Sequence, residues 1–184
     1  MKKVLVFIAD GTEEIEVFTP VDFFRRAGIQ VDLVAVKDSK KVRLAHKVYA
    51  GADKTFDQVQ GQDYDAFYIP GGLPGATNIR DNEKVIELIK EAKDQGKILA
   101  AICAGPIVLE AGGLLKDKNF TCYPGFENEI SSGSFVDDLV VKDGNIFTGK
   151  GPAAAAKLSF ALIEELLGKD KAEEIKAQTL FNLL

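Results

Sequence analysis

The feature that most constrains this chain is a strand-to-helix turn that carries a cysteine. An apolar run at residues 98–102 stops at Cys103, two small residues and Pro106 follow, and helical spacing then begins. The spacing of residues 101–105 matches the nucleophile elbow G-x-S-x-G, with alanine for the first glycine and cysteine for serine. A thiol at a helix N-terminus faces unpaired N–H groups, which favour a thiolate. This stretch alone fits a reactive nucleophile and a buried structural cysteine equally well.

Apolar runs alternate with helical patterns along the chain. The continuous apolar run at residues 4–9 is typical of a strand covered on both faces of a parallel sheet. Further strands are predicted at residues 29–36, where the pattern alternates, and at 65–69 and 98–102. Helical periodicity is found at residues 13–26, 83–94, 106–111, 153–167 and 170–180. Shorter strands are predicted at 120–123, 139–141 and 146–148, and a small hairpin at 42–44 with 47–50. The pattern predicts an α/β fold with one mostly parallel sheet, helices on both faces, and a single domain over residues 1–184.

Local signals predict how two of these helices begin and run. Thr12 or Asp10 is the expected N-cap of the first helix. Pro20 lies inside that helix and is expected to kink or interrupt it. Asp170 is the expected cap of the last helix.

Composition excludes several classes of protein. The 184 residues are 46% hydrophobic and 28% charged, and no apolar run approaches the roughly 20 residues of a membrane span. The net charge of −5 and the lack of a basic stripe argue against a nucleic-acid partner. Two cysteines make no disulfide framework, which predicts a reducing cytoplasm. His46 is the single histidine and no ligand spacing surrounds it, so no metal site is predicted.

Three glycine-containing turns follow predicted strands, at residues 10–16, 70–75 and 103–106. Ligands bind beyond the carboxyl ends of strands in such sheets, so neighbouring strands would bring these turns into one pocket. The turn at 70–75 lacks the ending of a phosphate-binding P-loop. The N–H of Gly72, with an N–H at the elbow, suits an oxyanion hole. The alternative is a tight turn with no chemical role.

The acidic run at Glu13, Glu14 and Glu16 begins the first helix. Glu13 and Glu14 are interpreted as a solvated helix start that complements the dipole. Glu16 lies one turn further and would point back over the sheet end toward the thiol, where low dielectric and a thiolate raise a carboxyl pKa. It would then act as a general acid and base, unless it is also solvated. His46 precedes the glycine turn and Tyr123 follows the elbow, so a Cys-His-Asp hydrolase is poorly supported.

Together these motifs resemble those of the DJ-1/ThiJ/PfpI superfamily over nearly the whole chain. The matching stretches, in order, are residues 11–16, 20–22, 25–28, 69–72, 100–106 and 149–152. The resemblance is nearest to the branch of the Parkinson-disease deglycase and its bacterial chaperone-like relatives. It implies a flavodoxin-like fold, a homodimer and no cofactor. It also implies Cys103 as reactive cysteine, Glu16 as its protonated partner, and Gly72 and Ala104 as backbone oxyanion donors beside Gly71. Tyr123 stands where some members carry histidine, and it is a hydrogen-bond donor rather than a base.

The leading functional hypothesis is a thiol enzyme of glyoxalase or deglycase type. In it Cys103 adds to a small α-oxoaldehyde or to an early glycation adduct of a protein, and Glu16 shuttles protons. Proteolysis is not expected. The alternative is an oxidative-stress sensor or chaperone that works by oxidation of Cys103. A third interpretation is a binding domain without catalysis. Cys122 is interpreted as a structural cysteine, and His46 as a surface residue.

Overall fold

A seven-stranded sheet forms the centre of the fold. The computed structural model describes all of residues 1–184. The strand order is β10-β11-β7-β6-β1-β2-β5, and every neighbouring pair is parallel except the β10–β11 hairpin. The strands of this sheet are β1 (Lys3–Ile8), β2 (Gln30–Ala35), β5 (Lys54–Thr55), β6 (Ala66–Ile69), β7 (Ile98–Ile102), β10 (Val140–Asp143) and β11 (Ile146–Gly149).

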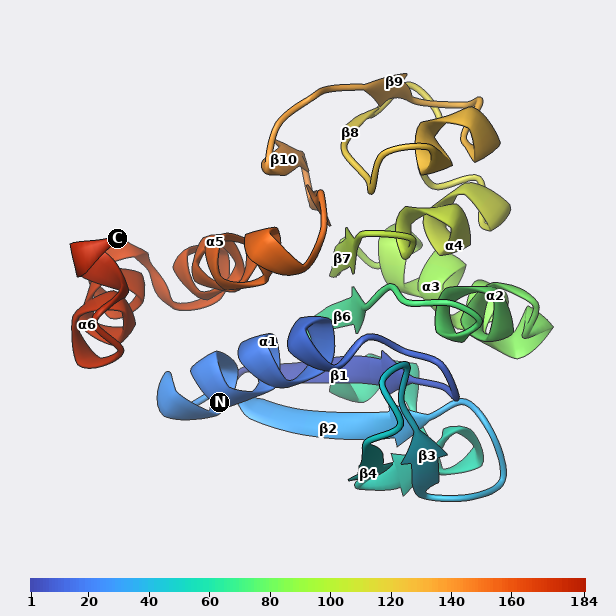
Figure 1. The fold of residues 1–184 in the computed structure, drawn as a ribbon, viewed down its shortest axis with the longest axis horizontal. Coiled ribbons are helices and arrows are strands. Elements are labelled where there is room, and N and C mark those ends of the chain that lie inside the picture. The colour runs from blue at the N-terminus through green and yellow to red at the C-terminus, as the bar shows by residue number, and fades with distance from the viewer.

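Helices cover both faces of the sheet, and Figure 1 shows α5 and α6 on the opposite side of the molecule from α2, α3 and α4. The helices are α1 (Glu14–Arg26), α2 (Gly75–Arg80), α3 (Glu83–Asp94), α4 (Pro106–Ala111), α5 (Ala155–Leu167) and α6 (Lys169–Gln178). One buried core lies between the sheet and α1, α5 and α6, and a second lies between the sheet and α2, α3 and α4. The predicted α/β fold, with a mostly parallel sheet and helices on both faces, is therefore confirmed.

Two small sheets lie outside the central one. The predicted hairpin is present as antiparallel β3 (Lys41–Arg43) and β4 (Tyr49–Gly51). The second sheet pairs β8 (Asn119–Phe120) with β9 (Ser134–Phe135). Short 3₁₀ helices occupy Phe56–Gln58, Gly61–Asp63, Phe126–Glu129, Pro152–Ala154 and Phe181–Leu183.

Helix α1 differs from expectation at its start and in its middle. Its N-cap is Glu13, whose carboxylate accepts from the Ile15 N–H, and not Thr12 or Asp10. The Thr12 hydroxyl is instead bonded to the backbone of Ala9, and the Asp10 carboxylate binds elsewhere. The helix also continues through Pro20 without interruption.

Pro20 is tolerated in α1 because the helix is held by burial of one face against the sheet. Val17, Val21 and Phe24 all lie in the core on that face. Proline has no N–H, so the carbonyl four residues earlier, that of Glu16, lacks its helical donor.

Three further expectations need correction. The last helix begins at Lys169, after Gly168 in a left-handed conformation, and Asp170 makes no capping hydrogen bond. The strand expected at 120–123 ends at Phe120, because the Thr121 N–H donates to the Thr148 side chain. Helix α2 follows directly after the glycine turn and was not predicted, since its first residue is the poor helix former Gly75.

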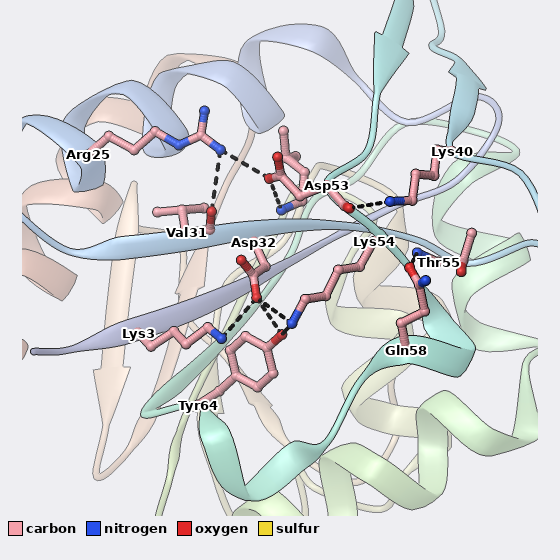
Figure 2. A network of polar contacts seen from close by, with 11 residues as sticks. Lys3, Arg25, Val31, Asp32, Lys40, Asp53, Lys54, Thr55, Gln58 and Tyr64 are labelled. Carbon is pink, nitrogen blue, oxygen red and sulfur yellow. Dashed lines mark hydrogen bonds and ion pairs between the residues drawn. The ribbon is translucent and has the colours of Figure 1, made fainter.

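A charged network holds β1, β2 and β5 together at one side of the sheet (Figure 2). The Tyr64 hydroxyl donates to Asp32 Oδ2 at 2.7 Å, and the ammonium groups of Lys3 and Lys54 lie 3.0 and 3.1 Å from the same oxygen. Burial opposes ionisation of Asp32, but these donors hold its pKa below the usual range. Because Asp32 is 7% exposed, the network acts where solvent screens it little.

Replacing Asp32 by alanine is expected to lower the free energy of unfolding by about 2 kcal/mol, since it leaves two ammonium groups and a hydroxyl without their acceptor. Urea denaturation at pH 7 measures the change. The matched control is Asp22→Ala, which breaks an exposed ion pair with Arg26 and is expected to cost under about 0.5 kcal/mol. Equal effects of the two variants would contradict the prediction.

None of the helices combines the length and the apolar composition that crossing a membrane requires.

Candidate active site

Cys103 sits at the sharp turn between β7 and α4. Its φ of 62° lies in the left-handed region, which non-glycine residues rarely adopt. The turn is tied to the sheet, because the Cys103 N–H donates to the Gly149 carbonyl at 2.8 Å. A Cβ at Gly105 would lie 2.6 Å from the Ile69 carbonyl oxygen, so only glycine fits there. The turn therefore has the strained, closely packed geometry of a nucleophile elbow.

The three predicted turns meet at one end of the sheet, because β7, β6 and β1 are adjacent in that order. Gly71 lies at the meeting point. A Cβ added to it would lie 2.7 Å from Cys103 Cβ, 2.8 Å from the Ala104 nitrogen and 2.8 Å from Glu16 Oε2. The absence of a side chain at Gly71 thus allows the thiol turn and the glutamate to come together.

Glu16 is fully buried although it lies in the first turn of α1. Its Oε2 accepts a hydrogen bond of 2.7 Å from the Gly71 N–H. Its Oε1 is buried with no hydrogen-bond partner. The side chain points back over the sheet end, as the sequence predicts, and the solvated alternative is wrong.

Cys103 and Glu16 form one acid–base pair. Burial raises the pKa of Glu16 to about 7, against the lowering effect of hydrogen bonds from Gly71 and Cys103. Burial, and then the charge and hydrogen bond of Glu16, raise the pKa of Cys103 to about 12. Burial and Glu16 therefore raise the pKa of the thiol by more than the helix N-terminus lowers it. The pair loses its first proton near neutrality and carries a single negative charge over a wide pH range.

Two backbone donors face the sulfur. The N–H groups of Gly72 and Ala104 hydrogen-bond to Cys103 and lower its pKa, opposing burial. Gly72 has a φ of 82°, and a Cβ on it would lie 2.5 Å from the Glu13 nitrogen. The Gly71 N–H is used differently, since it is bonded to Glu16. The site thus combines a thiol, a buried carboxyl and two N–H groups aimed at the sulfur.

Residues 2–165 match the sequence model of the DJ-1/PfpI family. The chain belongs to this family. It is 36% identical over 176 residues to Drosophila melanogaster Protein dj-1beta, and the alignment covers 95% of this chain and 94% of the relative. It is 33% identical over 181 residues to the Schizosaccharomyces pombe "Glutathione-independent glyoxalase DJ-1", covering 93% of this chain and 94% of the relative.

Solved structures agree with this assignment. The structure of oxidized Toxoplasma gondii DJ-1 superposes with a TM-score of 0.94 and 39% sequence identity, covering 98% of each chain. Drosophila melanogaster DJ-1beta gives a TM-score of 0.94 at 36% identity, covering 97% of each chain. The fold of this chain is therefore the DJ-1 α/β fold.

Among the predicted site residues of this DJ-1/PfpI chain, Tyr123 is the one with a polar side chain that makes no hydrogen bond with the thiol. Its backbone N–H donates to the Cys103 carbonyl at 3.0 Å. Its side chain is half exposed, lies against Gly151 and makes no hydrogen bond within the chain. The main chain of Tyr123 thus supports the thiol turn, while its hydroxyl does not bond to the thiol. Cys122 is fully buried in the opposite core, in keeping with a structural cysteine.

Glu13 and Glu14 are not the solvated helix start that the sequence suggests. Their side chains are only 12% and 14% exposed. Glu13 caps α1, and Glu14 accepts from the His46 backbone N–H at 2.7 Å and lies 2.8 Å from His46 Nδ1. His46 itself is exposed, as expected, and the hydrogen bond to Glu14 raises its pKa.

One unpaired buried polar group was not predicted. Tyr68, in β6, has a fully buried hydroxyl without a hydrogen-bond partner. The charges of Glu16 and Cys103 both act on it. The available signal was a tyrosine inside an apolar strand, because a buried phenol needs a partner for its polar tip.

Proposed function

We propose that this chain is a cysteine-dependent, cofactor-free enzyme that converts small α-oxoaldehydes, or the early adducts they form on proteins, to 2-hydroxyacids. Cys103 is the nucleophile and Glu16 the general acid and base. The observation that carries the proposal is the buried Glu16 carboxyl paired with the Cys103 thiol, with a pKa near neutrality. A general acid or base works best when its pKa lies near the operating pH.

The first step is addition of the thiol to the aldehyde carbon. The Glu16 carboxylate accepts the thiol proton as the C–S bond forms, and the carbonyl electron pair moves to oxygen. The Gly72 and Ala104 N–H groups, which face the sulfur, stabilise that oxygen. Return of the proton from Glu16 gives a hemithioacetal, so the pair ends the step with its original charge.

The second step moves a proton between the two substrate carbons. Glu16 removes the proton from the former aldehyde carbon, and the electron pair forms an enediol as the ketone oxygen is protonated. Protonation of the second carbon and loss of the hydroxyl proton give a thioester of the 2-hydroxyacid. Water then adds to the thioester carbon and the C–S bond breaks. The sum is oxoaldehyde plus water to 2-hydroxyacid, without an external oxidant or reductant.

The test is product formation from methylglyoxal in deuterated water. We expect one enantiomer of lactate to predominate. We also expect deuterium at carbon 2, because the proton that Glu16 carries exchanges with the solvent. Chiral chromatography and NMR measure both. Lactate formed no faster than in protein-free buffer would contradict the proposal.

A second candidate function is an oxidant sensor, favoured by the two N–H groups that face the sulfur. Two equivalents of peroxide convert a thiolate to a sulfinate and two waters, and a sulfinate is a strong hydrogen-bond acceptor. Oxidation confined to Cys103 by mild peroxide, with Cys122 unchanged by peptide mass analysis, would support it. Equal oxidation of both cysteines would contradict it. The homodimer implied by the family resemblance remains a prediction for either function.

A further inference from the structure

A shallow, mainly apolar hollow lies next to the thiol turn, and the chemistry described above does not use it. Its volume is about 230 Å³. Three segments form its walls: Tyr123 and Pro124 after β8, Leu139 just before β10, and residues 150–154 at the start of α5. These segments are far apart in the sequence, and the fold brings them together at the end of the sheet that carries Cys103.

The main chain of Cys103 is bonded to two of these walls. Its N–H donates to the Gly149 carbonyl at 2.8 Å, and Gly149 directly precedes the wall residue Lys150. Its carbonyl accepts from the N–H of Tyr123, another wall residue, at 3.0 Å. The turn that carries the thiol therefore borders the hollow.

The thiol and the hollow lie on the same face of the sheet. The side chain of Cys103 packs against the core shared with α1 and α5, and Ala154 of the hollow belongs to that core. Glu16 lies on the other side of the thiol, because the order β11-β7-β6-β1 places the end of β7 between the end of β11 and the start of α1. A substrate whose two carbonyl carbons reach Cys103 and Glu16 can thus extend its remaining substituent over the hollow.

The walls of the hollow favour an uncharged, apolar group. The side chains of Tyr123 and Leu139 are both half exposed, so they present apolar surface to solvent. The Tyr123 ring lies against Gly151, where an added Cβ would be 3.2 Å from Tyr123 Cδ2. Lys150 is the one charged residue in the walls, and its ammonium group is already paired with the Asp137 carboxylate. Covering this surface with an apolar group removes it from water, whereas a carboxylate or phosphate would meet no free cation there.

We propose that the hollow is a subsite for the substituent of the substrate, and that the preferred substrates are α-oxoaldehydes with an aryl substituent. Tyr123 and Leu139 are then specificity-determining residues. An apolar cavity of about 150 Å³ binds benzene, so this hollow is large enough for a phenyl ring. The ring of Tyr123 provides an aromatic surface on which such a substituent packs offset or edge-on. This inference rests on the proposed function, since it names the substrate class of the same site.

The test compares alkylation of Cys103 by phenacyl bromide and by bromoacetone, which differ only in a phenyl group in place of a methyl group. Each rate, measured by peptide mass analysis, is divided by the rate of the same reagent with free N-acetylcysteine, which removes the difference in intrinsic reactivity. The normalised rate is expected to be at least about tenfold higher for phenacyl bromide, the usual scale of discrimination by an apolar pocket.

Leu139→Asn is expected to reduce this preference to about twofold or less, because it places an amide in the wall of the hollow. The wall itself should remain, since the Leu139 carbonyl accepts from the Lys150 N–H at 2.9 Å through the main chain. Tyr123→Ser should have the same effect. The matched control is Val136→Asn, in the same loop as Leu139 and similarly exposed but outside the hollow, and it should keep the preference.

Equal normalised rates for the two reagents in the natural chain would overturn the inference, and so would an equal loss of preference in Val136→Asn and Leu139→Asn. Turnover gives a second measurement, in which kcat/KM should be about tenfold higher for phenylglyoxal, which yields mandelate, than for methylglyoxal. A higher kcat/KM for methylglyoxal would contradict the inference and still support the proposed function. Failure to turn over either aldehyde would contradict the proposed function, and the alkylation rates would still test the hollow.

Discussion

Cys103→Ser is expected to lower the rate of lactate formation from methylglyoxal by about a thousandfold or more. Serine places a hydroxyl at the same strained turn, with the same N–H groups of Gly72 and Ala104 facing it. A hydroxyl is a far weaker nucleophile than a thiol, and Glu16 with a pKa of about 7 is too weak a base to ionise it. The measurement is kcat/KM by enzymatic assay of lactate.

The control for this result is Cys122→Ala, which removes the other thiol. Cys122 is fully buried in the core on the side of α2, α3 and α4, so its loss is expected to reduce stability slightly and leave turnover within about twofold. If Cys103→Ser keeps its activity, Cys103 is not the nucleophile.

Glu16→Gln is expected to lower kcat/KM by a factor of about a hundred to ten thousand, the usual contribution of a general acid and base. In the natural chain kcat/KM should rise with pH through about 7, as the pair loses its first proton. The variant should lack that rise. Its thiol then titrates alone, with one inflection below pH 12, because the charge of Glu16 no longer opposes ionisation of the thiol.

The same substitution is expected to stabilise the fold at pH 8. The folded pKa of Glu16, about 7, lies above the unfolded value of 4.5, so the natural chain loses stability as pH rises through this interval. The full loss in the free energy of unfolding corresponds to about 3 kcal/mol. Glutamine does not ionise, so Glu16→Gln does not undergo this loss. Urea denaturation at pH 5 and pH 8 tests this.

The control is Glu14→Gln on the same turn of α1. The pKa of Glu14 is lowered rather than raised, because its hydrogen bonds to His46 outweigh a burial effect of the opposite sign. This variant should retain activity and should gain no stability at alkaline pH. A variant at Glu16 that is less stable at pH 8 than the natural chain would refute the burial of an ionisable carboxyl.

The sequence predicted the parts of the site that depend on local spacing. The elbow pattern located Cys103 at a strand-to-helix turn and left a structural cysteine equally possible, and the position of Glu16 left a solvated side chain possible. The family resemblance is what selected the two residues as a reactive pair. The rule that ligand sites in parallel sheets lie at strand ends predicted one pocket only if the three strands were neighbours, and the sheet order β7-β6-β1 shows that they are. The sequence did not predict the pKa values of Cys103 and Glu16. These depend on burial, which results from the packing of α1 and β6 and is not encoded in residue spacing.

Two of the errors concern hydrogen bonds that depend on tertiary packing. Thr12 was a sound N-cap by residue type, but its hydroxyl is bonded to Ala9, and Glu13 caps the helix instead. Tyr68 is the one residue with a polar group on its side chain in the otherwise apolar strand β6. Its unpartnered hydroxyl is visible only once α1 and β6 are packed together.

The use of main-chain groups at this site has a consequence for how it can be dissected or can evolve. The Gly71, Gly72 and Ala104 amides face the carboxyl or the sulfur, and no side-chain replacement except proline deletes an amide hydrogen. Alanine scanning would report on Cys103 and Glu16 and overlook the rest. Amide-to-ester exchange in a semisynthetic chain would be needed to weigh each donor. Natural substitutions can likewise change only Cys103, Glu16 and the side chains around them, whereas the three amide donors are retained as long as the backbone keeps its conformation.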